Sequence, residues 1–224
     1  MKRGSPRGCR IALGCALIVV VAIALFFFYT GRVIDRNNAV LVNNLRQPSG
    51  VSGAVGLYPK NPAPVDGSEL VDVRRPPSQS VLYPGIKMRD TLDEVRTALK
   101  AKGIQFAYNH NFFNGQDSIE YYIRGKILGM PKEEEFYYSF FFYNSRLYTS
   151  NIGPDRLTRE QAMSYCTEWR SKVADIMKVP PRENDSGGTT DWEWHDSRAS
   201  IMVLCKESAH AGVWQASIVF IQLR

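Results

Sequence analysis

The chain has 224 residues, of which 44% are hydrophobic and 22% charged, and its formal net charge is +6 at pH 7. Seven of the 28 basic residues and one of the 22 acidic residues lie in residues 1–50, so the 21 basic and 21 acidic residues of 51–224 balance. A neutral segment has no electrostatic footprint for phosphate backbones, so we expect no nucleic-acid partner.

An apolar segment near the N-terminus predicts a transmembrane helix. Ile11–Tyr29 comprises 19 residues without a charge, and a helix of that length reaches about 28 Å, enough for the hydrocarbon core of a bilayer. The segment ends in the aromatic cluster Phe26–Tyr29 and no small-x-small site follows, which argues against a cleaved signal peptide. Cys15 lies too early in the segment for a lipoprotein signal. We therefore expect residues 11–29 to contact membrane lipid as a signal-anchor.

The charged flanks of this segment predict its orientation. Four basic residues and no acid precede it within the tail 1–10, and Arg32 and Arg36 follow it with Asp35 between them. The more cationic flank of a membrane helix stays in the cytoplasm. We expect a cytoplasmic N-terminus in the cell inner membrane and a C-terminal domain in the periplasm, or on another extracytoplasmic side.

Residues 30–84 are predicted to be a juxtamembrane segment followed by a linker rich in Pro and Gly. Seven of the 12 prolines lie between Pro48 and Pro84, a composition typical of an extended spacer. The alternative for part of this region is that Leu70–Val73 docks as an edge strand.

A first α+β unit is predicted over residues 85–153. Thr91 and Glu94 have the spacing of a capping box, and the apolar positions that follow predict a helix that ends at Gly103. Short runs with strand periodicity come next, and Asn144-Ser145 is the expected turn of a hairpin. The predicted strands are 104–108, 119–124, 136–143 and 147–152.

A second unit of the same order is predicted over residues 154–224. Thr158 and Gln161 form another capping box, and the helix ends before Pro180. Its expected apolar stripe is Ala162, Cys166, Trp169, Val173 and Ile176. A polar loop over 183–188 then leads to strands over 190–195, 199–206 and 213–223. The predicted fold class is α+β, with a tandem helix-plus-antiparallel-meander domain whose helices cover one sheet face and leave the other open.

The opening of the first unit resembles that of small envelope proteins. Residues 85–95, GIKMRDTLDEV, are similar to the "G-x-x-x-x-x-T-x-x-E-V" start of SmpA/OmlA-type outer-membrane assembly lipoprotein modules. The tandem layout resembles β-lactamase-inhibitor-protein-like domains. These families bind proteins and are not enzymes, so the resemblance implies the same for this chain. The chain differs from them in its predicted membrane helix.

One strand carries a candidate catalytic or metal-binding cluster. Asp191, Glu193 and His195 alternate along a predicted strand, so all three point to one face. The simpler interpretation is a solvated face opposite Trp192 and Trp194, which then pack inward. No further ligand is marked by the sequence, and we expect neither a metal nor another cofactor.

The aromatic density of the first unit indicates a binding surface. Residues 136–143 read FYYSFFFY, which is apolar on both faces of a strand. Aromatic residues interleaved with Asn and Ser are typical of protein-binding surfaces, whereas the alternative is a second packed layer. The expected partner-binding residues are Tyr122, Tyr137, Phe141, Tyr143, Phe112 and Phe113.

The cysteines outside the anchor region predict a disulfide. Cys166 lies on the apolar stripe of the second helix and Cys205 in a strand expected to face it. In an oxidising compartment such a pair forms a bond. The alternative is two free thiols in the core.

These observations favour a membrane-anchored, extracytoplasmic binding or structural module that engages another envelope protein as an assembly factor, inhibitor or immunity-type partner. The alternative is a membrane-tethered hydrolase that uses Asp191, Glu193 and His195.

Overall fold

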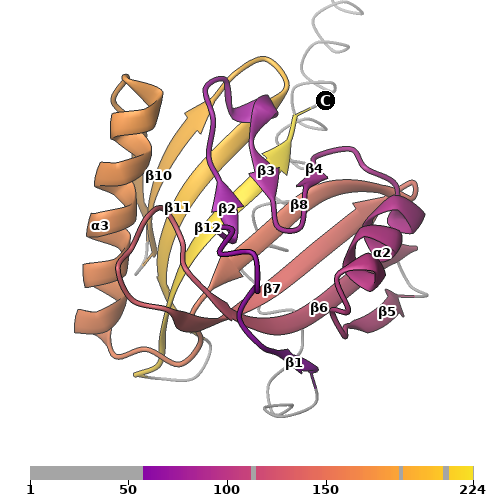
Figure 1. Cartoon of the computed structure of the whole chain (residues 1–224). Helices are drawn as coiled ribbons and strands as arrows, with labels where there is room; N and C mark the ends of the chain where they lie inside the picture. The colour runs from indigo at the N-terminus through magenta and orange to yellow at the C-terminus, as the bar shows by residue number, and fades with distance from the viewer. Residues whose placement is uncertain (1–57, 112–114, 187–188, 209–211, 224) are drawn as a thin grey trace, which may run out of the picture. The chain divides into compact units, whose positions relative to one another are not determined.

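The computed structural model describes residues 58–111, 115–186, 189–208 and 212–223 (Figure 1). These residues belong to one compact unit that begins at Gly53. The predicted membrane helix over 11–29 lies outside the described residues. In the described part of the chain, none of the helices has the length and apolar character needed to cross a membrane.

The described unit is mixed α/β, mostly sheet, with two α-helices, α2 (Leu92–Ala101) and α3 (Arg159–Met177). A short 3₁₀ helix, η1, covers Pro77–Gln79. The strands are β1 (Lys60–Asn61), β2 (Val71–Asp72), β3 (Val81–Leu82), β4 (Ile86–Lys87), β5 (Ala107–Asn111), β6 (Gln116–Gly125), β7 (Glu134–Tyr143), β8 (Arg146–Gly153), β9 (Arg182–Ser186), β10 (Thr189–His195), β11 (Ala199–Glu207) and β12 (Trp214–Gln222).

Most of the strands form one large sheet. Its order is β1-β6-β7-β8-β12-β11-β10-β9, and β5 pairs with the first half of β6 on the edge that β1 extends. All pairs are antiparallel except β1 with β6. In chain order α2 precedes β5–β8 and α3 precedes β9–β12, and the pairing of β8 with β12 joins these two sets of strands.

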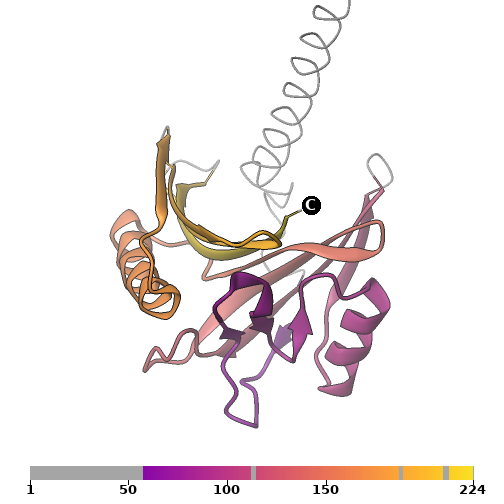
Figure 2. The same ribbon diagram turned by 90° about the horizontal axis from the view of Figure 1, so that it is seen from above.

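The two helices and the small sheet β2-β3-β4 lie on the same side of the large sheet, with the small sheet between the helices (Figures 1 and 2). Their apolar residues pack against one face of the large sheet into a single core. Among the largest fully buried side chains are Trp169 of α3, Leu99 of α2 and Leu82 of the small sheet.

Both predicted capping boxes are confirmed. The Thr91 side chain accepts a hydrogen bond from the Glu94 N–H, and the Glu94 carboxylate accepts one from the Thr91 N–H. Thr158 and Gln161 make the same reciprocal pair at the start of α3. Each box satisfies backbone donors that a helix N-terminus otherwise leaves open.

The apolar stripe of α3 differs from the prediction at one position. Ala162, Cys166, Trp169 and Val173 are fully buried, but Ile176 is 36% exposed and Met177 is buried in its place. Val173 and Met177 are four residues apart, which keeps them on one side of a helix with 3.6 residues per turn. The stripe therefore continues through Met177.

Two regions expected to be loop or linker contain strands. Over residues 58–84, expected to be a linker, Leu70 and Leu82 are buried in the core and β1 pairs with β6. The alternative expectation of an edge strand at Leu70–Val73 corresponds to β2, at one edge of the small sheet. Residues 182–186, expected in a polar loop, form the edge strand β9 beside β10. An edge strand needs no apolar alternation when it is solvated, so its sequence resembles a loop.

The Cys166–Cys205 disulfide is present and joins α3 to β11, with the two Cα atoms 6.2 Å apart. Both residues are fully buried between the helix and the sheet. The bond closes a loop of 39 residues, and such a cross-link restricts the unfolded chain more than the folded one.

Candidate binding face

Strand alternation gives the large sheet a second face, opposite the helices. Tyr121 and Tyr138 are paired across β6 and β7 and point into the core. The adjacent pair, Tyr122 and Tyr137, therefore points to the other side of the sheet. We call this side the open face. Its residues on the central strands, followed through the strand register, are Ser118, Glu120, Tyr122, Tyr137, Ser139, Phe141, Tyr143, Thr149, Asn151, Ser217, Val219, Ile221, Ser200, Met202 and Leu204.

The open face brings together four of the residues predicted to bind a partner. The ring centroids of Tyr122 and Tyr137 are 5.3 Å apart, and Phe141 and Tyr143 follow Tyr137 along β7. Exposure rises along this row, from the buried Tyr122 through the partly buried Tyr137 and Phe141 to Tyr143, which is 52% exposed. The other two predicted residues, Phe112 and Phe113, lie outside the described residues.

Two tyrosines that are not among the predicted binding residues extend this aromatic row. The Tyr58 ring centroid lies 5.6 Å from that of Tyr137, and the Tyr148 ring lies edge-on to Tyr143 at 6.2 Å. Tyr148 is the extra residue of a bulge, because Phe141 pairs with Thr149 and the next residue of β7 pairs with Leu147. Periodicity could not place either residue, since Tyr58 precedes the sheet and Tyr148 breaks the alternation.

A buried carboxylate lies beneath the tyrosines. Glu120 is only 3% exposed and accepts hydrogen bonds from Ser118 Oγ at 2.8 Å and from the Tyr137 hydroxyl at 2.5 Å. The Tyr58 hydroxyl also bonds to it. Burial, and then the nearby Glu120 charge, raise the pKa of Tyr137 and of Tyr58 well above the usual value. These hydroxyls therefore remain protonated donors, and the Glu120 side chain is fixed in place.

Tyr122 lies at the margin of this network. Its hydroxyl donates to Asp155 Oδ2 at 3.2 Å, and the Lys60 ammonium lies 5.4 Å from the ring centroid. Burial, and then the Asp155 charge, raise the pKa of Tyr122 to about 12.

The centre of the open face carries polar atoms without hydrogen-bond partners. Thr149 Oγ1 and Asn151 Oδ1, two residues apart on β8, are buried and have no hydrogen-bond partner among the described residues. The neighbouring strand contributes Val219 and Ile221, which pair with Asn151 and Thr149. An unsatisfied buried hydroxyl or amide oxygen costs about 1–3 kcal/mol.

Asp191, Glu193 and His195 lie on the open face of β10, near the far edge of the sheet. Trp192 and Trp194 are buried on the opposite side, as the simpler interpretation expects. The Asp191 carboxylate accepts a hydrogen bond from Asn184, and that of Glu193 accepts one from Ser200. Across the described ranges there is no group of three or more His, Cys, Asp or Glu side chains arranged to hold a metal ion.

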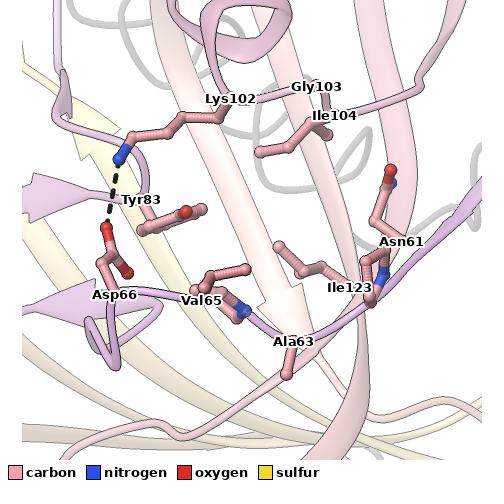
Figure 3. Close-up of a pocket in the computed structure, with 11 residues that line it drawn as sticks. Asn61, Ala63, Val65, Asp66, Tyr83, Lys102, Gly103, Ile104 and Ile123 are labelled. Carbon is pink, nitrogen blue, oxygen red and sulfur yellow. Dashed lines mark hydrogen bonds and ion pairs between the residues drawn. The ribbon is translucent and has the colours of Figure 1, made fainter.

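A separate hollow of about 300 Å³ lies on the helix side of the unit, between the segment 62–66 and the end of α2 (Figure 3). Tyr83, Ile104 and Ile123 line it, and Lys102 pairs with Asp66 at 3.1 Å across one side. Several of its polar groups are already engaged: besides the Lys102–Asp66 pair, the Asn61 side chain bonds the backbone of both Gln105 and Tyr122. The hollow therefore presents mainly apolar surface, with few groups that could orient a ligand.

Searched against protein-family models, curated proteins and solved structures, the chain finds no match. The fold alone gives the class of the protein, which is mixed α/β with a mostly antiparallel sheet. Helices cover one face of this sheet, and the open face carries aromatic and polar side chains.

Proposed function

We propose that the chain is a single-pass membrane-anchored protein whose extracytoplasmic domain binds another envelope protein through the aromatic row of the open face. The observation that carries this proposal is that Tyr122, Tyr137, Phe141 and Tyr143 share one face, on the side of the sheet that neither helix covers.

The composition of this row supports a protein partner. Tyrosine and phenylalanine bury large areas at little cost in side-chain entropy, and they are enriched at the centres of protein interfaces. Phe141 and Tyr143 retain solvent exposure, whereas Tyr137 is held by its bond to Glu120. A fixed aromatic row loses less conformational freedom on binding than a mobile one.

The anchor and the repeat are parts of the same proposal. Residues 11–29 are proposed to span the inner membrane with the N-terminus in the cytoplasm, and the Cys166–Cys205 bond is consistent with an oxidising compartment outside it. The order of one helix followed by antiparallel strands, found twice in the chain, supports a tandem α+β arrangement. The resemblance to SmpA/OmlA-type and β-lactamase-inhibitor-protein-like modules points to the same protein-binding role.

Site-specific photo-crosslinking in native membranes tests the binding face. A photoreactive phenylalanine analogue replaces Tyr143 in the full chain, and the matched control carries it at Ile176, which is exposed on α3. We expect one discrete adduct from position 143, none from position 176, and loss of the adduct when Phe141→Ala is added. An equal adduct from both positions, or none from position 143, contradicts the proposal.

Protease protection tests the topology. Protease added outside an intact inner membrane should digest the domain after residue 45 and leave the N-terminal tail. A protected C-terminus, or a mature chain that starts after Tyr29, contradicts the proposed anchor.

A further inference from the structure

The carboxylate beside the aromatic row is held by neutral groups only. Glu120 accepts hydrogen bonds from the hydroxyls of Ser118, Tyr137 and Tyr58, and the Asn109 amide donates to its Oε1 atom at 3.5 Å. In the described part of the chain no Lys, Arg or His side chain forms an ion pair with Glu120. These bonds fix the carboxylate in place but leave its negative charge without a matching cation.

The other end of the row shows what a ring and a carboxylate bind together. The Lys60 ammonium lies 2.7 Å from Glu135 Oε1 and 5.4 Å from the ring centroid of Tyr122. A cation is attracted to the face of an aromatic ring, and a carboxylate beside the ring adds its own attraction. At this end of the row, a lysine of the chain itself therefore occupies the combination.

Tyr137 and Phe141 form the same combination with Glu120. Ser139 is the register partner of Glu120, so the rings of Tyr137 and Phe141 lie on either side of the position opposite the carboxylate. The Tyr137 hydroxyl donates to Glu120, which increases the electron density of the ring and so strengthens its attraction for a cation. Among the described residues no Lys or Arg side chain lies over either ring.

Two basic residues near the row are already matched by an acid. Lys60 pairs with Glu135, and Arg124 is the register partner of that same residue. Their position is two residues from Tyr137 along β7, in the direction away from Phe141. Charge complementarity at Tyr137 and Phe141 therefore calls for a cation from outside the described chain.

We propose that the partner places a Lys or Arg side chain over Tyr137 and Phe141, where the Glu120 carboxylate attracts it. This inference rests on the proposed function and specifies the chemistry of the partner, which is a basic segment and not an acidic or purely apolar one. The rings supply contact area, and the carboxylate selects the sign of the charge.

Variants of Glu120 in the full chain test the role of the charge in native membranes. The measurement is the yield of the adduct from the photoreactive residue at position 143. Glu120→Gln keeps the size of the side chain but removes its charge, and it should lower the yield about tenfold. Glu120→Asp keeps the charge and should retain most of the adduct.

The matched control for these variants is Glu193→Gln. Glu193 also lies on the open face and accepts a hydrogen bond from a hydroxyl, that of Ser200, at 2.7 Å, but it is remote from the aromatic row and its loss should leave the yield unchanged. An unchanged yield in Glu120→Gln, an equal loss in Glu120→Asp, or an equal loss in the control overturns the proposal.

Salt dependence gives a measurement on the parent chain itself. Salt screens charges across an interface, so the yield should fall between about 0.05 and 0.5 M NaCl, and that of Glu120→Gln should change less. A yield that is constant or rises with salt contradicts a basic partner. A parent that forms no adduct contradicts the proposed function and this inference with it, whereas an adduct that tolerates both salt and Glu120→Gln contradicts this inference alone.

Discussion

The two faces of the large sheet are built from the same strands but differ in chemistry. On the helix side Tyr121, Tyr138 and Phe140 lie in mutual ring contact, with centroids 5.3–6.1 Å apart, and all are fully buried. The residues next to these in the strands, which point to the open face, are Glu120, Ser139 and Phe141. One residue along a strand therefore separates a core side chain from a candidate contact residue, because successive side chains point to opposite faces.

This difference in chemistry separates the residues that stabilise the fold from those that are proposed to bind a partner. The helix side gains free energy from apolar burial, whose loss leaves a cavity. The open face is held by specific polar contacts, such as that of Tyr137 with Glu120, which restrict the side chains without filling a core. Substitutions on the two faces should therefore give separable effects on unfolding and on binding.

The largest difference is expected between the neighbours Phe140 and Phe141. Phe140→Ala removes a fully buried ring and should lower the free energy of unfolding by about 3–5 kcal/mol. Phe141→Ala removes a partly buried ring on the open face and should cost only about 1–2 kcal/mol, while it abolishes the partner adduct. Denaturant titration of the full chain in detergent measures both changes. Similar losses of stability for the two variants would contradict the assignment of the faces.

The disulfide should have the next largest effect. It ties α3 to the helix side of β11 and closes a loop of 39 residues, for which the chain-entropy model gives about 3–4 kcal/mol. The double variant Cys166→Ala/Cys205→Ala should lose that amount of stability yet keep the Tyr143 crosslink under conditions where it is folded. Mass spectrometry checks the bond itself: two alkylatable thiols at these positions after denaturation without reductant would show that it is absent.

A smaller effect is expected from the hydroxyl of Tyr137. Tyr137→Phe removes a hydrogen bond to the buried Glu120 carboxylate, and bonds to charged groups contribute about 1.5–3 kcal/mol. Tyr122→Phe is the control, because its hydroxyl bonds to the exposed Asp155 at 3.2 Å and should contribute less. If the two variants have equal unfolding midpoints, the Glu120 network does not stabilise the open face.

The smallest expected effect is the dependence of stability on pH that the Asp196 carboxylate causes. Burial opposes ionisation of Asp196, but hydrogen bonds from Ser78 and from the N–H groups of Arg198 and Ala199 hold its pKa at about 2. Its contribution is therefore present above the unfolded pKa near 4 and is lost as the pH falls towards 2. Because this carboxylate is only partly buried, solvent screens its interactions and the contribution is about 1 kcal/mol or less.

The comparison of unfolding midpoints at pH 6 and pH 2.5 measures this contribution. Asp196→Asn should be less stable than the parent at pH 6, and the gap should narrow at pH 2.5. A gap that is constant or that widens at low pH would contradict the assignment of this contribution to the Asp196 carboxylate.

Local sequence signals predicted the elements whose interactions are themselves local. The capping boxes at Thr91 and Thr158 required only contacts three residues apart, and the turn at Asn144 and Ser145 depends on two residues that adopt positive φ. Alternation along residues 136–143 distinguished the inward rings from those of the open face. The expected pairing of Cys166 with Cys205 also followed from the apolar stripe and strand period, because each pattern indicates which side of its element faces the core.

The tertiary structure decided the features that depend on distant partners. Strands β1–β4 have two residues each, too few for a periodic signal, and they form because β6 and the core lie beside them. Tyr58 joins the aromatic row only because pairing at the edge of β6 brings residues over 60 positions apart into contact. By itself the sequence determined most of the residues of the helices and long strands that face inward, since that follows from the period of the chain, although at the end of α3 Met177 and not Ile176 is buried. It could not determine which segments complete the sheet edges, because the backbone hydrogen bonds that add a short strand to an edge require no pattern of side chains.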